Sequence, residues 1–445
     1  MMIFVELLVM FVVSMYFFPI EFVWFPGINT KMAMAAVGLV IAAGYLMKEK
    51  STNIPRPLLI VMMISSMVSI IGFISVTYNQ TSDYTYVSYV ASAAVWLSAA
   101  FVVCNVIKWV HGRLDVRLIV GYLTAVCVYQ CVMALLIDNV APVKTFVDSF
   151  VEQAQDGLTE NHRLYGVGAS LDTAGSRFST VLVAISVFLG VTKENMKLSR
   201  MLTYIFSFFF ITVVGNMIAR TTTVGAGIGL AWLLFVLAQP TIRQASSRMR
   251  LLGVMTGILL VGVPVLVFLY NTSPWVNEQL RFAFEGFFSL IETGEWHVSS
   301  NDMLEKIVVF PDNLKTWLIG DGYFNSAIGD VNFLGQDTLS GYYKGTDIGY
   351  CRFLFYFGIP GLLAIMSVMV YTAVATARII PEYKFLFLLV LVVGLVVWTK
   401  VATDVFVALA IYFVVALMEG DGSAEDDIPD WDIEEEASKG LIRRD

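Results

Sequence analysis

The chain has 445 residues, of which 58% are hydrophobic and only 14% are charged, and its mean hydropathy is +0.75. Soluble domains average about 25% charged residues, so this composition excludes an ordinary soluble protein and predicts an all-α polytopic integral membrane protein. The net charge of −8 comes from residues 419–445, which carry eleven acidic and three basic side chains and which we expect to form an acidic, disordered cytoplasmic tail.

Twelve stretches of the chain are long and apolar enough to cross a bilayer. A membrane-spanning helix needs about 20 mostly apolar residues. The first stretch lacks a basic n-region and a small-residue cleavage site, so we expect it to remain as a span. The predicted spans are residues 3–19, 31–48, 58–76, 87–107, 118–137, 178–192, 201–217, 222–238, 251–270, 351–374, 384–399 and 402–418.

Two regions, 201–238 and 384–418, are each either one long helix or a hairpin of two short spans. Polar residues interrupt both regions: three threonines follow Arg220, and Lys400 and Asp404 interrupt the second. A charge at the centre of a bilayer costs at least about 2.5–3.5 kcal/mol. We therefore expect two hairpins, with these charges at the membrane surface.

Basic residues predict the orientation of the chain in the membrane. Of its 28 Lys and Arg residues, 17 lie in the tail and in the connections on one side, whereas the short connections opposite carry only Lys31, Arg220 and Lys400. Cytoplasmic connections are enriched in Lys and Arg, so both termini are expected to be cytoplasmic. Residues 1–418 then form one transmembrane domain, with two long loops, 138–177 and 271–350, on the non-cytoplasmic side.

The second long loop is predicted to contain short amphipathic helices. In residues 276–291, apolar side chains such as Leu280 and Phe284 recur at helical spacing, with charged side chains on the other face. This pattern is typical of a helix that lies in the membrane interface. Asp302 and Glu305 have the spacing of a capping box, which predicts the start of a second helix.

Arginines gather on the predicted non-cytoplasmic side. A guanidinium group binds phosphate through paired hydrogen bonds and keeps its charge. One arginine alone more often pairs with a carboxylate or a lipid headgroup, but the group together predicts a site for a lipid-linked diphosphate. Arg220 is the strongest candidate, because three threonines and a predicted helix N-terminus follow it. The group consists of Arg163, Arg177, Arg220, Arg281 and Arg352.

Two residues are candidates for proton transfer. His297 can act as a base near neutral pH, although a histidine in a loop is commonly only solvated. Asp347 enters a predicted span five residues before Arg352, where it is either a general base or one partner of a structural ion pair. Asp321 lies between two glycines, in a turn that either bares the backbone to substrate or simply reverses the chain.

The sequence predicts no cofactor, no metal and no nucleic-acid partner. It has no glycine-rich phosphate loop, no zinc-ligand spacing, no nucleophile elbow and no pronounced basic patch. Cys127 and Cys131 lie one helical turn apart, but no His or further Cys accompanies them. We expect both to be small apolar residues of a helix rather than metal ligands.

Four short motifs follow one another along the chain on the predicted non-cytoplasmic side. They are residues 163–166 (Arg-Leu-Tyr-Gly), 219–223 (Ala-Arg-Thr-Thr-Thr), 317–323 (Trp-Leu-Ile-Gly-Asp-Gly-Tyr), and 347–350 (Asp-Ile-Gly-Tyr) followed by 357–362 (Phe-Gly-Ile-Pro-Gly-Leu). In their order and predicted side, they resemble motifs of the bacterial O-antigen polymerase and O-antigen ligase superfamily. The resemblance implies a metal-independent glycosyltransferase of the bacterial inner membrane that uses undecaprenyl-diphosphate-linked oligosaccharides. The resemblance also implies membrane lipids and a chain-length regulator protein as partners.

The prediction is a polymerase that joins lipid-linked repeat units at the periplasmic face. Ligases of this superfamily tend to carry a histidine before the span that follows the large loop, and this chain has Asp347 there, which favours polymerase over ligase. Outside the class, the alternative is a transporter or flippase of lipid-linked sugars, which would place charges near mid-membrane. The expected catalytic residues are Asp347, His297 and Arg220, and the expected substrate-binding residues are Arg163, Arg177, Arg281, Arg352, Asp321 and Tyr350.

Overall fold

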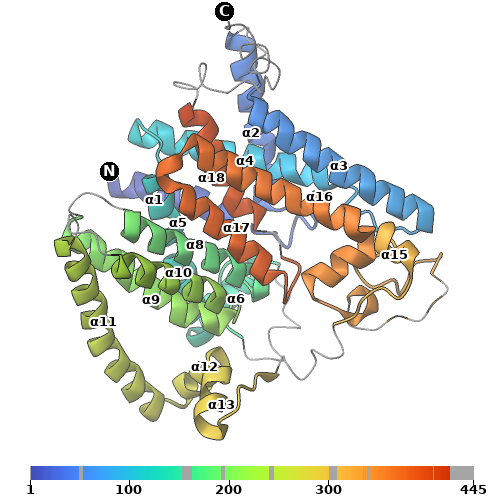
Figure 1. Ribbon diagram of the computed structural model, residues 1–445. Coiled ribbons are helices and arrows are strands. Elements are labelled where there is room, and N and C mark those ends of the chain that lie inside the picture. The colour runs from blue at the N-terminus through green and yellow to red at the C-terminus, as the bar shows by residue number, and fades with distance from the viewer. Residues whose placement is uncertain are drawn as a thin grey trace, which may run out of the picture.

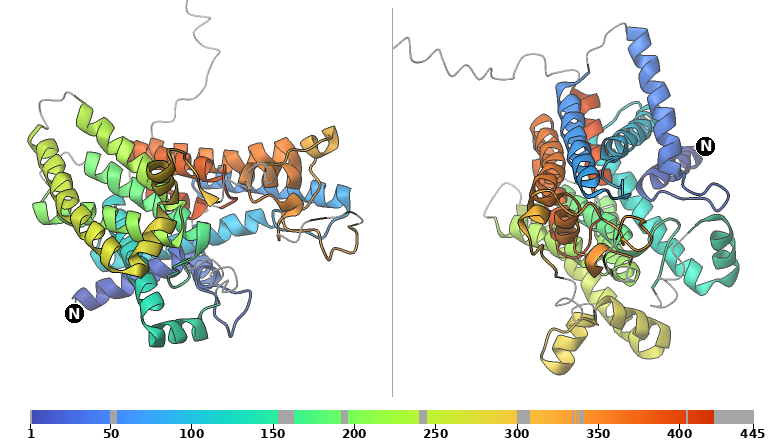
Figure 2. Two further views of the ribbon diagram at one scale, coloured as in Figure 1. Left: turned by 90° about the horizontal axis from the view of Figure 1, so that it is seen from below. Right: turned by 90° about the vertical axis from the view of Figure 1, so that its right-hand side faces the viewer.

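The computed structural model describes residues 2–49, 54–152, 163–191, 196–239, 245–299, 308–333, 335, 337, 341–403 and 405–420. Within these residues the secondary structure is helical, with isolated β-bridges and no strand. The helices pack into a bundle, with α11, α12 and α13 at its edge (Figure 1; Figure 2). The α-helices are α1 Met2–Phe17, α2 Thr30–Glu49, α3 Arg56–Asn79, α4 Tyr89–His111, α5 Val116–Asn139, α6 Ala141–Phe150, α8 Leu171–Val191, α9 Leu198–Ile218, α10 Thr222–Ala238, α11 Ala245–Thr272, α12 Pro274–Ala283, α13 Glu285–Thr293, α15 Leu314–Leu318, α16 Gly349–Ile379, α17 Lys384–Val397 and α18 Phe406–Gly420.

Each of the twelve predicted spans coincides with a helix. In the described part of the chain, seven helices are long and apolar enough to cross a membrane: α3, α4, α5, α8, α9, α11 and α16. Apolar side chains also cover the outside of the bundle; on α11, for example, Leu260 is 71% exposed and Phe268 is 65% exposed. Such a surface is unusual in water. The structure therefore indicates a polytopic membrane protein, and the count of twelve spans stays a prediction.

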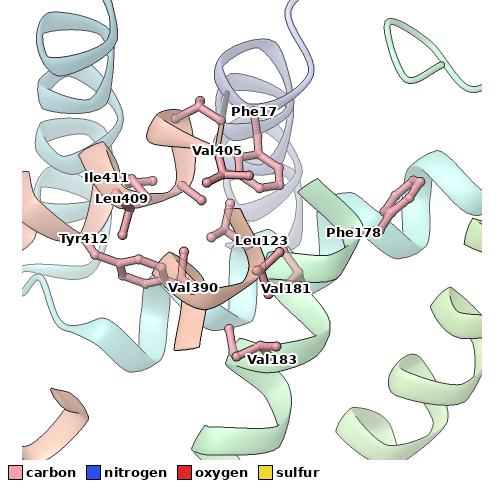
Figure 3. Packing of buried hydrophobic residues seen from close by; sticks show 14 of the residues in the cluster. Phe17, Leu123, Phe178, Val181, Val183, Val390, Val405, Leu409, Ile411 and Tyr412 are labelled. Atoms are coloured by element: carbon pink, nitrogen blue, oxygen red, sulfur yellow. The ribbon is translucent and has the colours of Figure 1, made fainter. Parts of the chain in front are cut away.

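The centre of the bundle consists of helices that are buried on all sides. In α18, residues 406–416 are all buried, and α8 is almost as fully enclosed. Figure 3 shows side chains of α1, α5, α8, α17 and α18 at this centre, among them Phe17, Leu123, Val181 and Val390. Helices that are apolar all round are expected in the interior of a large bundle.

Small residues bring α8 and α10 into close contact. A Cβ atom added to Gly225 of α10 would lie 2.2 Å from the Cα atom of Ser179 in α8. The Ser179 hydroxyl donates a hydrogen bond to the Thr221 carbonyl at 2.8 Å and accepts one from the Gly225 amide at 3.0 Å. Small side chains and interhelical hydrogen bonds commonly drive helix association in membranes. This contact fixes the start of α10, and with it Arg220, against the first turns of α8.

Both regions predicted as hairpins are divided into two antiparallel helices. Between α9 and α10, Gly215 lies against Thr222 close to the break, and further away Phe208 lies against Gly229. Between α17 and α18, the rings of Phe387 and Tyr412 have centroids 5.5 Å apart. The two breaks therefore lie at helix ends, as the charges in them predicted.

The long loops contain more helix than predicted. Helix α6 lies inside the predicted loop 138–177, and α8 begins at Leu171, which places Arg177 within a helix. The predicted helix 276–291 is two helices, because Phe284 adopts a non-helical conformation with φ −121° and ψ 32°. Helix α6 was missed because a search for spans of about 20 residues passes over a helix of this length. The predicted capping box at 302–305 and the tail beyond residue 420 lie outside the described residues.

Helix α16 is broken near its start, and segment 313–322 packs against the break. Phe357 and Gly358, inside the predicted span 351–374, leave the helical conformation. The freed carbonyl of Phe355 accepts a hydrogen bond from the Asp321 amide at 2.5 Å, as backbone groups at membrane depth require. Gly320 permits the approach: its φ is +84°, and an added Cβ would lie 2.4 Å from a backbone oxygen of α16.

Candidate functional site

Charged side chains from separate parts of the chain meet at one end of the bundle. Asp172, in the first turn of α8, lies between two of these parts. Its Oδ1 atom accepts a hydrogen bond from the Thr221 hydroxyl at 3.1 Å and lies 3.2 Å from Nζ of Lys400, in the connection between α17 and α18. Asp172 therefore joins the α9–α10 turn to the α17–α18 connection.

Two guanidinium groups lie over one aromatic ring beside Asp172. The Cζ atoms of Arg163 and Arg220 are 5.5 and 5.0 Å from the ring centroid of Phe282 in α12. Arg220 also donates a hydrogen bond to Glu285 at the start of α13. Nε of Arg163 is buried and has no hydrogen-bond partner among the described residues. Among the described residues, Glu285 is the one carboxylate hydrogen-bonded to this pair of cations, so the pair offers further donors to an incoming anion.

The pKa of Arg163 reflects its burial and the charges of both signs around it. Burial lowers the pKa of its guanidinium, nearby Asp172 raises it, and the like charge of Arg220 lowers it again. An arginine nonetheless keeps its proton in a protein. Arg163 is therefore a cation whose Nε atom has no hydrogen-bond partner among the described residues, and it lies close enough to Arg220 for the two charges to repel.

Asp347 lies on the other side of Lys400. It precedes α16, and its carbonyl accepts a hydrogen bond from the Ala402 amide at 3.2 Å. Its Oδ1 atom is buried and has no hydrogen-bond partner in the described residues. Burial raises the pKa of the Asp347 carboxyl, Asp172 raises it further, and Lys400 and Arg352 lower it. A carboxyl group with a raised pKa is a better proton acceptor than an ordinary one.

These residues place three cations and three carboxyl groups in one site, with one of the carboxyls shifted toward its neutral form. Neutralising Asp347 would leave an excess of positive charge, which suits a substrate with a negatively charged group. We refer to the following six residues as the charged cluster: Arg163, Asp172, Arg220, Glu285, Asp347 and Lys400.

Arg352 is engaged inside the protein. It is 5% exposed and lies between two aromatic rings, with Cζ 3.6 Å from the centroid of Phe324 and 4.3 Å from that of Tyr342. Its Nη2 donates hydrogen bonds to the Phe324 carbonyl at 3.0 Å and to Oδ1 of Asn325 at 3.2 Å. These contacts fasten segment 311–348 to α16. Arg352 also contributes positive charge behind Asp347.

Asp321 likewise supports segment 311–348. Its Oδ1 atom lies 2.6 Å from Nζ of Lys315 and accepts a hydrogen bond from the Thr316 hydroxyl at 2.6 Å. Its Oδ2 atom accepts a hydrogen bond from the Tyr343 hydroxyl at 3.2 Å. Burial first, and the Asp321 charge second, raise the pKa of Tyr343. A carboxylate with three donors has little capacity left for a substrate.

Two other predicted substrate-binding residues lie within helices and contact their neighbours. Tyr350, in the first turn of α16, donates a hydrogen bond to the Leu395 carbonyl of α17 at 2.8 Å. Arg177, in the second turn of α8, has Cζ 5.7 Å from the ring centroid of Phe18. The structure therefore places Tyr350 at the contact between α16 and α17, and Arg177 beside the end of α1.

Arg281 and His297 lie near α12 and α13. Arg281 forms a paired contact with Glu292 at 2.7 and 2.8 Å, which holds the pKa of Glu292 below its usual range. His297 is exposed. It lies two residues before Ser299, whose amide and hydroxyl each donate a hydrogen bond to Glu285 at 3.0 Å. His297 therefore lies two residues from a contact of the charged cluster. Arg281 is paired with Glu292, which is not a member of that cluster.

Sequence reasoning overlooked several members of this site. Lys400 was noted as a break between spans and as a basic residue of a short connection. Glu285 was placed only on the polar face of the predicted helix 276–291, and Asp172 and Phe282 were not singled out. An acidic residue in the first turn of a helix, such as Asp172, commonly serves only the helix dipole. Nothing in the spacing of Phe282 and Glu285 indicates that both would face Arg220 across the chain.

The sequence offered Cys127 and Cys131 as a possible metal pair, which was judged less favoured than two small apolar residues. Both lie in the hydrophobic core on α5, and both are free thiols. Among the described residues, no group of three or more His, Cys, Asp or Glu side chains is placed to hold a metal ion.

Comparison with known proteins assigns no family. No protein-family model, no curated protein and no solved structure is significantly similar to this chain.

Proposed function

We propose that the protein is a membrane glycosyltransferase that polymerises undecaprenyl-diphosphate-linked oligosaccharide repeat units at the periplasmic face of the bacterial inner membrane. One observation carries the proposal: Arg163, Arg220 and Lys400 converge around Asp172, next to the buried carboxyl of Asp347. Cations and a proton acceptor in one site are what glycosyl transfer from a diphosphate requires. The four motifs that resemble the polymerase and ligase superfamily support the same class.

The proposed reaction transfers a growing glycan to a new repeat unit. A hydroxyl oxygen of the acceptor sugar forms a bond to the anomeric carbon of the donor, and its proton passes to the carboxylate of Asp347. The bond between that carbon and the diphosphate oxygen breaks, and the diphosphate leaves with the electron pair. Negative charge grows on the leaving group, so Arg163, Arg220 and Lys400 stabilise it more in the transition state than before.

Two observations favour Asp347 over His297 as the proton acceptor. Asp347 has a buried oxygen without a hydrogen-bond partner in the described residues and a raised pKa. His297 is exposed on the segment that follows α13. Because a general base must be held close to the acceptor hydroxyl, we place Asp347 in that role.

The proposal is tested in the native host after deletion of the gene. Polymer length is read on a gel after complementation with the wild type, with Arg220→Ala or with Asp347→Asn, at matched amounts of membrane-inserted protein. A polymerase predicts that the deletion strain shows single repeat units and that only the wild type restores long chains. Loss of all surface glycan with accumulation of lipid-linked polymer would indicate a ligase. Lipid-linked units trapped on the cytoplasmic side would indicate a flippase.

The orientation is tested by fusions to a reporter that is active only outside the cytoplasm. Fusions after Asp156 and Asp330 should be active, and fusions after Gln244 and Ser423 should be silent. The reverse pattern would place the charged cluster on the cytoplasmic side and exclude a periplasmic reaction.

A further inference from the structure

Glu285 occupies the position on Arg220 where the proposed function requires an anion. Arg220 donates through Nη1 to Oε2 of Glu285, and the Arg220 side chain is only 14% exposed. Carboxylate and phosphate oxygens form the same kind of charge-assisted hydrogen bond with a guanidinium. A phosphate group and the Glu285 carboxylate therefore compete for one position.

Helix α13, which carries Glu285, is held loosely. Gly286 is its only buried residue in the described structure, and Phe287 and Ile291 are 49% and 82% exposed. Helix α12, in contrast, buries Leu280 and Ala283 against the bundle. The chain leaves the helical conformation between the two helices. Because little apolar surface is buried by α13, moving it away from Arg220 costs little hydrophobic free energy.

The groups around Glu285 divide into those that would move with it and those that would stay. Ser299 donates two hydrogen bonds to Glu285, each at 3.0 Å, and belongs to the segment that follows α13. The Phe282 ring, on α12, supports the guanidiniums of both Arg163 and Arg220. Withdrawal of Glu285 with α13 and Ser299 would thus leave the two arginines in place.

We propose that Glu285 is a resident competitor for the anionic group of the substrate. Its carboxylate neutralises Arg220 in the empty protein, where Arg163 and Arg220 would otherwise repel each other, and it is displaced together with α13 when a phosphate group binds. The identity of that anion as a diphosphate rests on the proposed function. The exchange itself rests on the contacts of Arg220, Glu285 and Ser299.

The test measures binding of inorganic pyrophosphate to the purified full-length protein in detergent by titration calorimetry, with sulfate as the control anion. Glu285→Gln keeps the size and a hydrogen-bond acceptor but removes the charge, so its Kd for pyrophosphate should be about tenfold lower than that of the wild type, or about 1.4 kcal/mol. Glu292→Gln is the matched control, because Glu292 is on the same helix and pairs with Arg281 instead. The Glu292–Arg281 pair joins α13 to α12, but an exposed pair of this kind contributes only about 0.2–1 kcal/mol, so the Kd of Glu292→Gln should change far less than that of Glu285→Gln.

The polymer assay supplies a second readout. Release of a competitor lowers KM for the lipid-linked donor in Glu285→Gln without raising kcat, whereas a merely structural change would lower kcat. Adding Arg220→Ala to Glu285→Gln should abolish the gain in pyrophosphate affinity, because the competed position is gone.

The outcomes separate this inference from the proposed function. Equal or weaker pyrophosphate binding in Glu285→Gln would overturn the competitor role while leaving diphosphate recognition intact. Failure of the wild type and both variants to bind pyrophosphate would overturn the competitor role and also remove diphosphate recognition from the proposed function. A tenfold gain that sulfate reproduces would show that Glu285 excludes anions in general, which overturns selectivity for a diphosphate.

Discussion

The charged cluster takes Asp347 from the end of segment 311–348, and the rest of this segment adjoins the cluster. Both regions are rich in Asp and Arg or Lys, but the hydrogen bonding of these groups differs between them. In segment 311–348, Asp321 and the neighbouring Arg352 are surrounded by hydrogen-bond partners. In the charged cluster, Nε of Arg163 and Oδ1 of Asp347 are buried without such partners in the described residues. Buried polar groups are normally satisfied. Asp321 and Arg352 therefore support the fold, whereas the unpartnered atoms of Arg163 and Asp347 belong to the site in which we propose that substrate binds.

The largest effect should follow from Asp347→Asn, which removes the proton acceptor while preserving the shape of the side chain. General-base catalysis contributes about 10²–10⁴-fold, so polymer formation should fall by that factor. The measurement is polymer formed per amount of inserted protein. Wild-type chain lengths from Asp347→Asn would contradict its role as base and transfer that role to His297.

Asp321→Ala should act on stability instead. It removes the acceptor for Lys315, Thr316 and Tyr343, and hydrogen bonds to charged groups contribute about 1.5–3 kcal/mol each. Because Lys315 also donates to Asn79 at 2.8 Å, we expect a net loss of about 2–4 kcal/mol, seen as a lower thermal midpoint in detergent. An unchanged midpoint with lost activity would instead place Asp321 in substrate binding.

Arg220→Lys should be nearly as inactive as Arg220→Ala. Lysine keeps the charge but loses the planar group that can hold two phosphate oxygens. A charge-assisted contact contributes about 1.5–3 kcal/mol, or roughly one to two decades in rate. If Arg220→Lys makes wild-type polymer at normal expression, paired phosphate binding at this residue is wrong, and Lys400 or Arg163 would carry the charge stabilisation.

Arg281→Ala should have a much smaller effect than Arg220→Ala. Arg281 and Glu292 are 44% and 49% exposed, and exposed ion pairs contribute about 0.2–1 kcal/mol. Polymer formation should stay within about threefold of the wild type. A loss as large as that of Arg220→Ala would place Arg281 in the substrate site together with Arg220.

The smallest effect concerns the stability cost of Asp347. Burial raises the pKa of this carboxyl above its ordinary value of 3.8, so the folded protein binds the proton more tightly than the unfolded chain. Its contribution to stability is therefore full below the ordinary pKa and is lost as pH rises through the raised pKa. Asp347→Asn should thus have a thermal midpoint at pH 7 equal to or above that of the wild type, and the difference should shrink at pH 4. A lower midpoint at pH 7 would show that the charged form is stabilised.

The amino-acid sequence by itself determined the helical architecture. Apolar stretches about 20 residues long can satisfy their backbone only as helices in a bilayer, so a helix was found at each predicted span. The charges at Arg220 and Lys400 likewise predicted the two breaks, because their desolvation excludes the membrane centre. The sequence also placed Arg163, Arg220 and Asp347 among the candidates.

Only the tertiary structure decided which charged residues share a site. Asp172, Glu285 and Lys400 are separated by more than 100 residues from one another, and the close packing of α8 on α10 and of α17 beside α18 determines that Asp172 meets Lys400. In the sequence, Asp321 and Arg352 are candidates for substrate binding just as Arg163 and Arg220 are. Only the folded structure shows the hydrogen-bond partners that occupy Asp321 and Arg352. Spacing along a chain reports helical faces, whereas partners and burial depend on three-dimensional packing, and these decide whether a charged group supports the fold or awaits a ligand.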